Sequence, residues 1–235
     1  MGFNNPSVAF LFTIFSFTVY NYSRWLENIN MAIKYIIGID EVGRGPLAGP
    51  VAIGMMVIEI EKYQDLLKQE IFQPGKDSKK LTPKKRAEYF FKINELKEQQ
   101  VLNYGVFFES NNIIDKFGIV GAINMAIKKG LLSLGDEPEK VQILLDGWLK
   151  APAEYLNQKS IIKGDESELV ISLASIVAKV IRDNKMEALA EDFVNYDLKN
   201  NKGYGTAKHI AGLRLYGPCK LHRRSFIKNF INKKS

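Results

Sequence analysis

The alternation of apolar and polar positions predicts that strands lead the chain and that helices end it. Short apolar runs rich in β-branched or aromatic residues, closed by glycine or acidic residues, are typical of buried strands. Such runs occupy residues 34–40, 51–60, 101–109, 141–146 and 160–163. Thr82 and Pro83 form a good start for one helix. Other segments typical of helices cover residues 119–134, 168–193 and 207–216. This order predicts an α/β or mixed domain built on a central sheet.

Composition narrows the class of protein. The 235 residues, 46% hydrophobic and 25% charged, suit one globular domain with a sizeable core. The formal net charge of +7 favours a polyanionic partner. Cys219 is the only cysteine and is joined only by His209 and His222, which excludes an internal disulfide and argues against structural zinc. A metal bound here would be a hard cation held by carboxylates, and the cysteine usage fits a reducing compartment.

Residues 1–30 differ in character from the rest of the chain. The stretch 8–20 is apolar and aromatic, with no charged residue before Arg24. It is shorter than the about 20 residues that span a bilayer, and it lacks the basic residues that precede the apolar part of a secretory signal. A membrane-surface anchor and an extension upstream of Met31 both remain open. We favour the hydrophobic extension, and we expect no stable membrane association.

Acidic residues follow three of the predicted strands, each with a glycine close by. They are the pair Asp40 and Glu41, then Asp146, then Asp165. Because strand ends meet at one edge of a sheet, we expect these side chains to converge there. Carboxylates that lie so close raise each other's pKa unless a cation neutralises them, and Mg²⁺ prefers such oxygen ligands. The alternative, in which each aspartate only caps a turn, is weaker for three parallel contexts than for one.

A glycine loop, Gly43-Arg44-Gly45, directly follows the first acidic pair. The acids alone would repel a phosphate, but a cation bound to them would attract one. The glycine loop, which lacks side chains at two positions, would let the backbone of the substrate come close to this site. Because successive strand residues point to opposite faces, the acidic pair shares a site only if the chain bends, and Gly43 eases such a bend. A dinucleotide-binding turn fits less well, because Pro46 follows the second glycine and no lone acidic residue ends the next strand.

Three further segments suit a polyanionic ligand. Ser78, Lys79 and Lys80 form a basic loop that either holds phosphates or is a solvated turn. A polar stripe along the largely apolar helix 168–193 either faces a site or forms an internal network. The stripe consists of Ser172, Ser175, Lys179 and Asp183. The tail from residue 200 onward interleaves basic and aromatic residues, which indicates nucleic-acid binding or a charged helical tail.

Taken together, these motifs resemble bacterial ribonuclease HII. Between residues 37 and 226 the chain contains, in the order found in that family, GIDEVGRGPLAGPV, DSKKL, LLDG, IKGDE, ASIVAKVIRD, KGYGT and HRRSF. The first motif is highly specific, and seven in order leave little room for chance. The resemblance implies a ribonuclease H-like fold, a mixed five-stranded sheet flanked by helices with a helical C-terminal segment. It also implies an endonuclease that hydrolyses RNA in RNA–DNA hybrids and incises 5′ of single ribonucleotides embedded in duplex DNA.

The resemblance also implies the catalytic acids. These acids, which would also bind the metal, are Asp40, Glu41, Asp146 and Asp165, with Asp183 as the alternative for the fourth place. We expect two divalent ions, Mg²⁺ or Mn²⁺, one activating a water and the other stabilising the leaving 3′ oxygen. The products would carry 3′-OH and 5′-phosphate ends, and no histidine is placed to act as a general base. A catalytically silent hybrid-binding protein would not need the acids, and a transposase-like nuclease would not need the GRG and KGYGT motifs.

Substrate-binding residues follow from the same motifs. In the family, the loop that matches Gly43, Arg44 and Gly45 grips the backbone around the ribonucleotide and senses its 2′-OH. Tyr204 is expected at the RNA-to-DNA junction, stacked on the deoxyribose and in contact with the 2′-OH. The remaining predicted contacts are Ser78, Lys79, Lys80 and Lys179.

The sister family, ribonuclease HIII, is a less suitable match. It has a larger N-terminal domain, and its fourth acid is a glutamate soon after the third aspartate, where this chain has Lys150. The expected organisation is the extension 1–30, a catalytic domain over residues 31–195 and a helical substrate-binding segment over residues 196–235. We expect a cytoplasmic monomer whose partners are RNA–DNA hybrids and ribonucleotide-containing duplex DNA.

Overall fold

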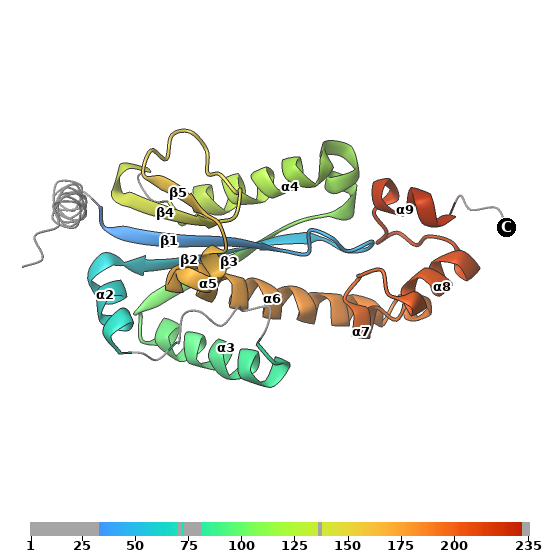
Figure 1. Cartoon of the computed structure of the whole chain (residues 1–235), viewed down its shortest axis with the longest axis horizontal. Coiled ribbons are helices and arrows are strands. Elements are labelled where there is room, and N and C mark those ends of the chain that lie inside the picture. The colour runs from blue at the N-terminus through green and yellow to red at the C-terminus, as the bar shows by residue number, and fades with distance from the viewer. Residues whose placement is uncertain (1–32, 70–71, 73–80, 136–137, 232–235) are drawn as a thin grey trace, which may run out of the picture.

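A mixed β-sheet forms the centre of the protein. The structure, a computed structural model, describes residues 33–69, 72, 81–135 and 138–231. Within these residues the sheet has five strands in the order β3-β2-β1-β4-β5 (Figure 1). The strands are β1 (Tyr35–Val42), β2 (Val51–Glu59), β3 (Leu102–Glu109), β4 (Val141–Asp146) and β5 (Gln158–Ile161). β2 pairs antiparallel with β1 and β3, whereas β4 pairs parallel with β1 and β5, so the mixed five-stranded sheet expected from the sequence is confirmed.

Helices cover both faces of this sheet. The described helices are α2 (Ile60–Lys68), α3 (Pro83–Glu98), α4 (Asn111–Leu134), α5 (Gly164–Ser167), α6 (Leu169–Ala190), α7 (Leu198–Asn201), α8 (Ala207–Tyr216) and α9 (Arg224–Ile231), with short 3₁₀ turns η1 (Pro138–Lys140) and η2 (Val194–Tyr196). α4 lies on one face, and α3 and α6 lie on the other (Figure 1). Ile37 and Ile39 of β1 pack in the core beneath α4, and Ile36 packs with α3 and α6. Burial on both faces explains why β1, β2 and β4 are largely apolar runs.

Two glycines let α6 lie directly on the sheet. A Cβ atom at Gly38 would be 2.2 Å from the Val170 carbonyl oxygen, and one at Gly54 would be 2.3 Å from that of Ala174. Any side chain at either position would therefore push the helix away from β1 and β2. This close approach places the polar second half of α6 beside the end of β1, where the acidic residues lie.

The C-terminal segment is helical, as expected. α8 and α9 lie beyond the end of β1, at the right of the view in Figure 1. The Thr206 hydroxyl caps α8 by accepting a hydrogen bond from the His209 N–H at 3.3 Å, and Gly217 follows its last residue with a φ of 71°. An isolated β-bridge between Ala48 and His222 is one of several contacts that join this segment to the loop after β1.

Several boundaries differ from the sequence-based expectations. α4 begins at Asn111, capped by Ser110, and it contains a non-helical Gly118 at φ 74°, directly before the predicted helix start. β5 lies two residues earlier than predicted, because Lys163 adopts a left-handed conformation and Gly164 begins α5. α2 begins at Ile60, the last residue of a predicted strand, and the sequence pattern indicates neither α2 nor α9. The predicted extension 1–30 and the basic loop lie outside the described residues.

α4 also satisfies a simple test for a membrane helix. Its length and composition would allow it to cross a membrane. Its buried residues, among them Ile123 and Ile127, instead pack with the core residues of the sheet. The core therefore explains the apolar residues on the buried face of α4, whereas Val120 and Leu132 are exposed.

Candidate active site

Three of the predicted acids converge at one edge of the sheet. Asp40, Glu41 and Asp146 each offer a carboxylate oxygen, and these oxygens lie within 4.8 Å of one another. The Asp40 side chain is buried at 1% exposure, while the other two are partly exposed. In the part of the chain that the structure describes, this is the one such group of three or more potential metal ligands. All the donors are carboxylate oxygens, so the group fits a hard divalent cation.

Sheet register explains the convergence. The parallel pairing of β1 with β4 ends at Ile39 and Leu145, so Asp40 and Asp146 are the next residues on two adjacent strands. On its other side β1 remains paired with β2 through Val42. The bend expected at the acidic pair is not what brings these residues together, because both lie within β1 and the left-handed Gly43, with a φ of 83°, comes only after them. The end of pairing on the β4 side leaves room for neighbouring side chains of β1 to approach Asp146.

Nearby donors balance part of the acidic charge. The Glu41 backbone N–H donates to Asp40 Oδ1 at 2.7 Å. Arg44 of the glycine loop lies 3.5 Å from a Glu41 carboxylate oxygen, and its side chain is half exposed, so water weakens this ion pair.

The fourth acid lies next to the group but is not part of it. Asp165, at 4% exposure, directs its backbone N–H to Asp146 Oδ1 at 3.4 Å. The alternative candidate, Asp183, accepts a hydrogen bond from Lys179 at 3.0 Å on α6. Neither carboxylate belongs to the three-acid group. The position of Asp165 beside Asp146 agrees with its predicted role, which stays a prediction.

Three of the positions predicted to bind substrate, Gly45, Lys179 and Tyr204, lie close together. A Cβ atom at Gly45 would be 4.0 Å from the Tyr204 ring, so the glycine loop and the tyrosine are neighbours. The Lys179 Nζ lies 5.9 Å from the centre of the same ring, and Tyr204 is 41% exposed. Ser78, Lys79 and Lys80 lie outside the described residues. The structure therefore brings together the loop, Lys179 and Tyr204, which are far apart in sequence.

A buried arginine from the C-terminal segment supports the glycine loop. Arg223 is fully buried and donates hydrogen bonds to the carbonyl groups of Gly43, Arg44 and Gly49 at 2.6, 2.9 and 3.0 Å. Burial lowers its pKa, and the nearby charge of Arg182 lowers it further. A guanidinium group suits this place because its donors satisfy several backbone carbonyls at once.

A second buried arginine lies beneath the same loop. Arg182 of α6 donates to the carbonyl groups of Pro50 at 3.0 Å and Lys202 at 3.2 Å. A Cβ atom at Gly43 would be 2.1 Å from its Nε. Sequence reasoning missed both arginines as functional residues, although their motifs were noted. The available signal was an arginine in a nearly apolar helix, because such residues are almost never fully buried without partners.

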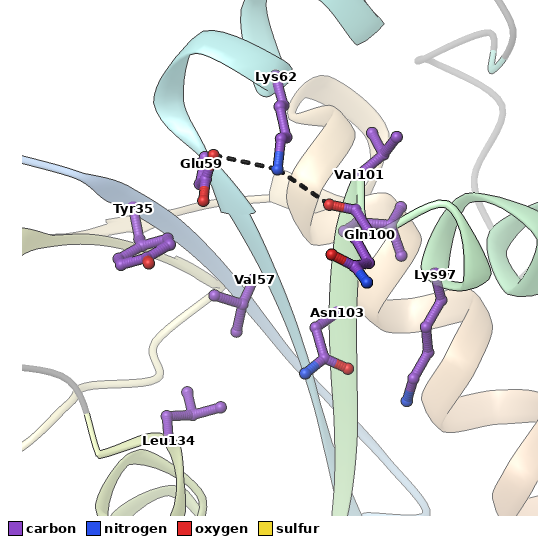
Figure 2. Close-up of a pocket in the computed structure, with 10 residues that line it drawn as sticks. Tyr35, Val57, Glu59, Lys62, Lys97, Gln100, Val101, Asn103 and Leu134 are labelled. Carbon is purple, nitrogen blue, oxygen red and sulfur yellow. Dashed lines mark hydrogen bonds and ion pairs between the residues drawn. The ribbon is translucent and has the colours of Figure 1, made fainter.

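A separate pocket of about 400 Å³ lies at the other end of β1 (Figure 2). Its lining includes Tyr35 at the start of that strand, and Lys62 spans it by pairing with Glu59 at 3.1 Å and bonding the Gln100 carbonyl at 3.0 Å. No predicted site residue lines it. The pocket therefore lies at the start of β1, whereas the acidic group lies at the end of that strand.

Comparisons with known proteins agree with this geometry. A sequence model described as ribonuclease HII matches residues 37–229. The ribonuclease HII of Caldicellulosiruptor bescii is 40% identical over 204 residues, which cover 87% of this chain and 92% of that protein.

Solved structures share the fold. The crystal structure of ribonuclease H2 from Pyrococcus horikoshii OT3 matches with a TM-score of 0.62 and 25% identity, covering 84% of this chain and 97% of that one. The structure of Bst-RNase HIII in complex with Mn²⁺ matches with a TM-score of 0.57 and 19% identity, covering 80% and 65%. The ribonuclease H-like fold expected from the motifs is thereby confirmed. Since the family's sequence pattern covers nearly every described element, the chain belongs to the ribonuclease HII family, whose members cleave RNA in RNA–DNA hybrids.

Proposed function

We propose that this ribonuclease H also incises duplex DNA 5′ of a single embedded ribonucleotide, leaving 3′-hydroxyl and 5′-phosphate ends. The observation that carries the proposal is the nearness of the Tyr204 ring to Gly45, where an added Cβ atom would be 4.0 Å from the ring, in the loop that follows Asp40 and Glu41. Phosphate contacts are the same in RNA and DNA, so reading one ribonucleotide needs a group that senses the sugar. The loop follows Asp40 and Glu41 in the chain, so a sugar read by this loop would lie next to the proposed hydrolytic acids.

The acidic group would hold the divalent cations. Asp40, Glu41 and Asp146 are the proposed ligands, with Asp165 as the fourth, and their oxygens suit Mg²⁺ or Mn²⁺. When bound, two such cations supply an activated water and neutralise charge on the leaving 3′ oxygen. The backbone N–H of Glu41 holds one Asp40 oxygen in place, so the carboxylate is oriented before any ligand arrives.

The surrounding residues would position the nucleic acid. Gly45 is exposed and lacks a side chain, so a sugar-phosphate backbone can lie close to the loop. Lys179, with its Nζ 5.9 Å from the centre of the Tyr204 ring, and the exposed Arg44 beside Gly45 would provide positive charge, and the exposed Tyr204 ring can pack on a deoxyribose. This arrangement supports residues 196–235 as a substrate-binding segment, because that segment contributes Tyr204 to the surface.

Neither histidine is available as a general base for the attacking water. His209 and His222 are buried and lie 3.1 Å apart through their Nε2 atoms. Proton removal from the water therefore falls to the acidic group and the substrate phosphates. The groups gathered at this edge of the sheet are indeed carboxylates, and neither imidazole ring lies among them.

The test uses a DNA duplex that carries one ribonucleotide, a long RNA–DNA hybrid and an all-DNA duplex. We expect metal-dependent cleavage of the first two, with the first cut 5′ of the ribonucleotide. Asp146→Asn should abolish both activities while hybrid binding persists, because the carboxylate contributes ligand charge and not substrate affinity. Cleavage of the hybrid alone would refute the single-ribonucleotide proposal. Hybrid binding without cleavage by the wild type would favour a catalytically silent binding protein.

A further inference from the structure

Three loops meet beneath the proposed junction-reading surface. The Gly203 carbonyl accepts hydrogen bonds from the backbone N–H groups of Leu47 at 2.8 Å and Ala48 at 3.3 Å. The Arg223 backbone N–H donates to the Leu47 carbonyl at 2.8 Å. The loop after β1 is therefore bonded both to the loop that contains Tyr204 and to the loop that contains Arg223. A direct link between the loop that contains Tyr204 and the loop that contains Arg223 would connect all three loops to one another.

Two histidines make that link. His209 of α8 and His222 are 0% and 1% exposed, and their Nε2 atoms lie 3.1 Å apart. The His209 Nδ1 lies 2.8 Å from the Tyr204 carbonyl oxygen. At the other end, the Cys219 backbone N–H donates to His222 Nδ1 at 3.0 Å. A continuous chain of hydrogen bonds thus runs from the main chain of Cys219 to that of Tyr204.

The chemistry of the two ends determines every proton between them. A carbonyl oxygen only accepts, so His209 must carry a proton on Nδ1, and in its neutral form Nε2 is then bare. A backbone N–H only donates, so His222 must have a bare Nδ1 and carry its proton on Nε2. The contact between the two Nε2 atoms then has one donor and one acceptor. The chain is satisfied with both rings neutral, and protonating either ring would place two hydrogens against each other.

The surroundings keep both rings neutral. Burial lowers the pKa of His209, and burial together with His209 lowers that of His222 to about 4. Among the described neighbours, Arg224 disfavours a charge on His222, while Asp197 acts in the opposite direction on His209. The Tyr196 ring lies with its centre 4.8 Å from that of His222, and the Cys219 thiol, whose pKa is raised by burial, lies 3.1 Å from His222 Nδ1.

We infer that His209 and His222 are positioning residues, which hold the main chain of Tyr204 against the glycine loop through a hydrogen-bond chain with one allowed proton arrangement. The inference rests on the proposed function, because it assigns the histidines a role in reading the junction. Tyr204 is 41% exposed, so the position of its backbone decides where the ring meets the substrate. Loss of the link to the Tyr204 carbonyl should therefore impair recognition more than hydrolysis.

The first test reads the tautomers directly. The chain contains only two histidines, so a long-range ¹⁵N–¹H spectrum of untagged protein shows only two imidazole patterns. At neutral pH we expect His209 as the Nδ1–H tautomer and His222 as the Nε2–H tautomer, assigned by comparison with single-histidine variants. Two rings in the same tautomer, or a charged ring, would overturn the inference.

The second test separates the two ends of His209. In His209→Asn, the side-chain amide occupies the place of Nδ1 and can still donate to the Tyr204 carbonyl. In His209→Gln, the amide occupies the place of Nε2 and loses that bond while keeping a polar group towards His222. For each variant we would measure kcat/KM on the single-ribonucleotide duplex and on the long hybrid, together with the melting temperature.

We expect His209→Gln to lower the ratio of the two kcat/KM values about fivefold, as the loss of one hydrogen bond implies. His209→Asn should keep the ratio within about twofold of the wild type, even if both variants melt at a lower temperature. An unchanged ratio in His209→Gln, or an equal fall in both variants, would show a purely structural role and overturn the inference. If the wild type cleaves hybrids but not the single-ribonucleotide duplex, the proposed function is refuted instead. The imidazole spectrum would then still test whether the hydrogen-bond chain has the expected tautomers.

Discussion

Replacing the two glycines of the loop at residues 43–45 with alanine should have different effects: loss of stability at Gly43 and loss of activity at Gly45. Gly43 is buried, has a φ of 83°, and would place its Cβ atom 2.1 Å from Arg182 Nε. Gly45 is exposed and has no such φ, and the nearest atom to its Cβ would be on the Tyr204 ring at 4.0 Å. The same added methyl group therefore tests folding at one position and substrate approach at the other.

The magnitudes follow from these environments. Gly43→Ala should lower the free energy of unfolding by about 1–3 kcal/mol, because a left-handed conformation is strained for alanine and Arg182 must move. At roughly 2–4 °C per kcal/mol for a chain of this length, the melting temperature should fall clearly. Gly45→Ala should change the free energy of unfolding by less than about 0.5 kcal/mol, as is usual at exposed sites.

The assay combines thermal unfolding with cleavage of the single-ribonucleotide duplex at one salt concentration. Gly45→Ala should reduce kcat/KM by tenfold or more while the melting temperature stays at the wild-type value, since the methyl group faces the expected position of the substrate backbone. The value of about tenfold corresponds to 1.4 kcal/mol of lost binding. Full activity of Gly45→Ala, or equal destabilisation by both variants, would refute the reasoning that the loop approaches the substrate at Gly45.

Three further predictions follow from individual contacts. Asp165→Asn should reduce kcat more than Asp183→Asn does, because Asp165 lies beside Asp146 whereas Asp183 pairs with Lys179; the reverse order would make Asp183 the fourth acid. Tyr204→Ala should reduce incision at a lone ribonucleotide far more than cleavage of a long hybrid, and Tyr204→Phe should lose less because the ring is kept; equal losses on both substrates would indicate general binding. Burial raises the pKa of Asp115, but hydrogen bonds from Ser225 and the Arg224 backbone, which join α4 to α9, lower it overall. The ionised Asp115 carboxylate should therefore stabilise the fold above the unfolded pKa of about 3.9, and this effect should be lost as the pH falls below that value. The difference in melting temperature between wild type and Asp115→Asn should shrink below about pH 4 and stay constant above about pH 5. A constant difference at all pH values would contradict this.

Local sequence was enough to predict the sheet and three of its acids. A buried strand needs a short apolar run, and the residue at which the run stops is visible in the sequence. Asp40, Glu41 and Asp146 all stand at such ends, and the structure brings their oxygens together. The predicted N-cap at Thr82 was also confirmed, because a cap depends only on residues within one turn.

Tertiary structure alone decided how the recognition surface is supported. Arg223 bonds to loop carbonyls 174 to 180 residues away in the chain, and Arg182 bonds to the Pro50 carbonyl 132 residues away, so no local pattern predicts these partners. The tautomers of His209 and His222 depend on which backbone groups meet their nitrogens after folding. The place of Asp165 beside Asp146 likewise depends on the register of β5 and on the left-handed turn at Lys163. Strand ends and caps follow from short-range hydrogen bonding and burial, whereas buried charges and imidazole protons are determined by partners that only the folded chain brings within reach.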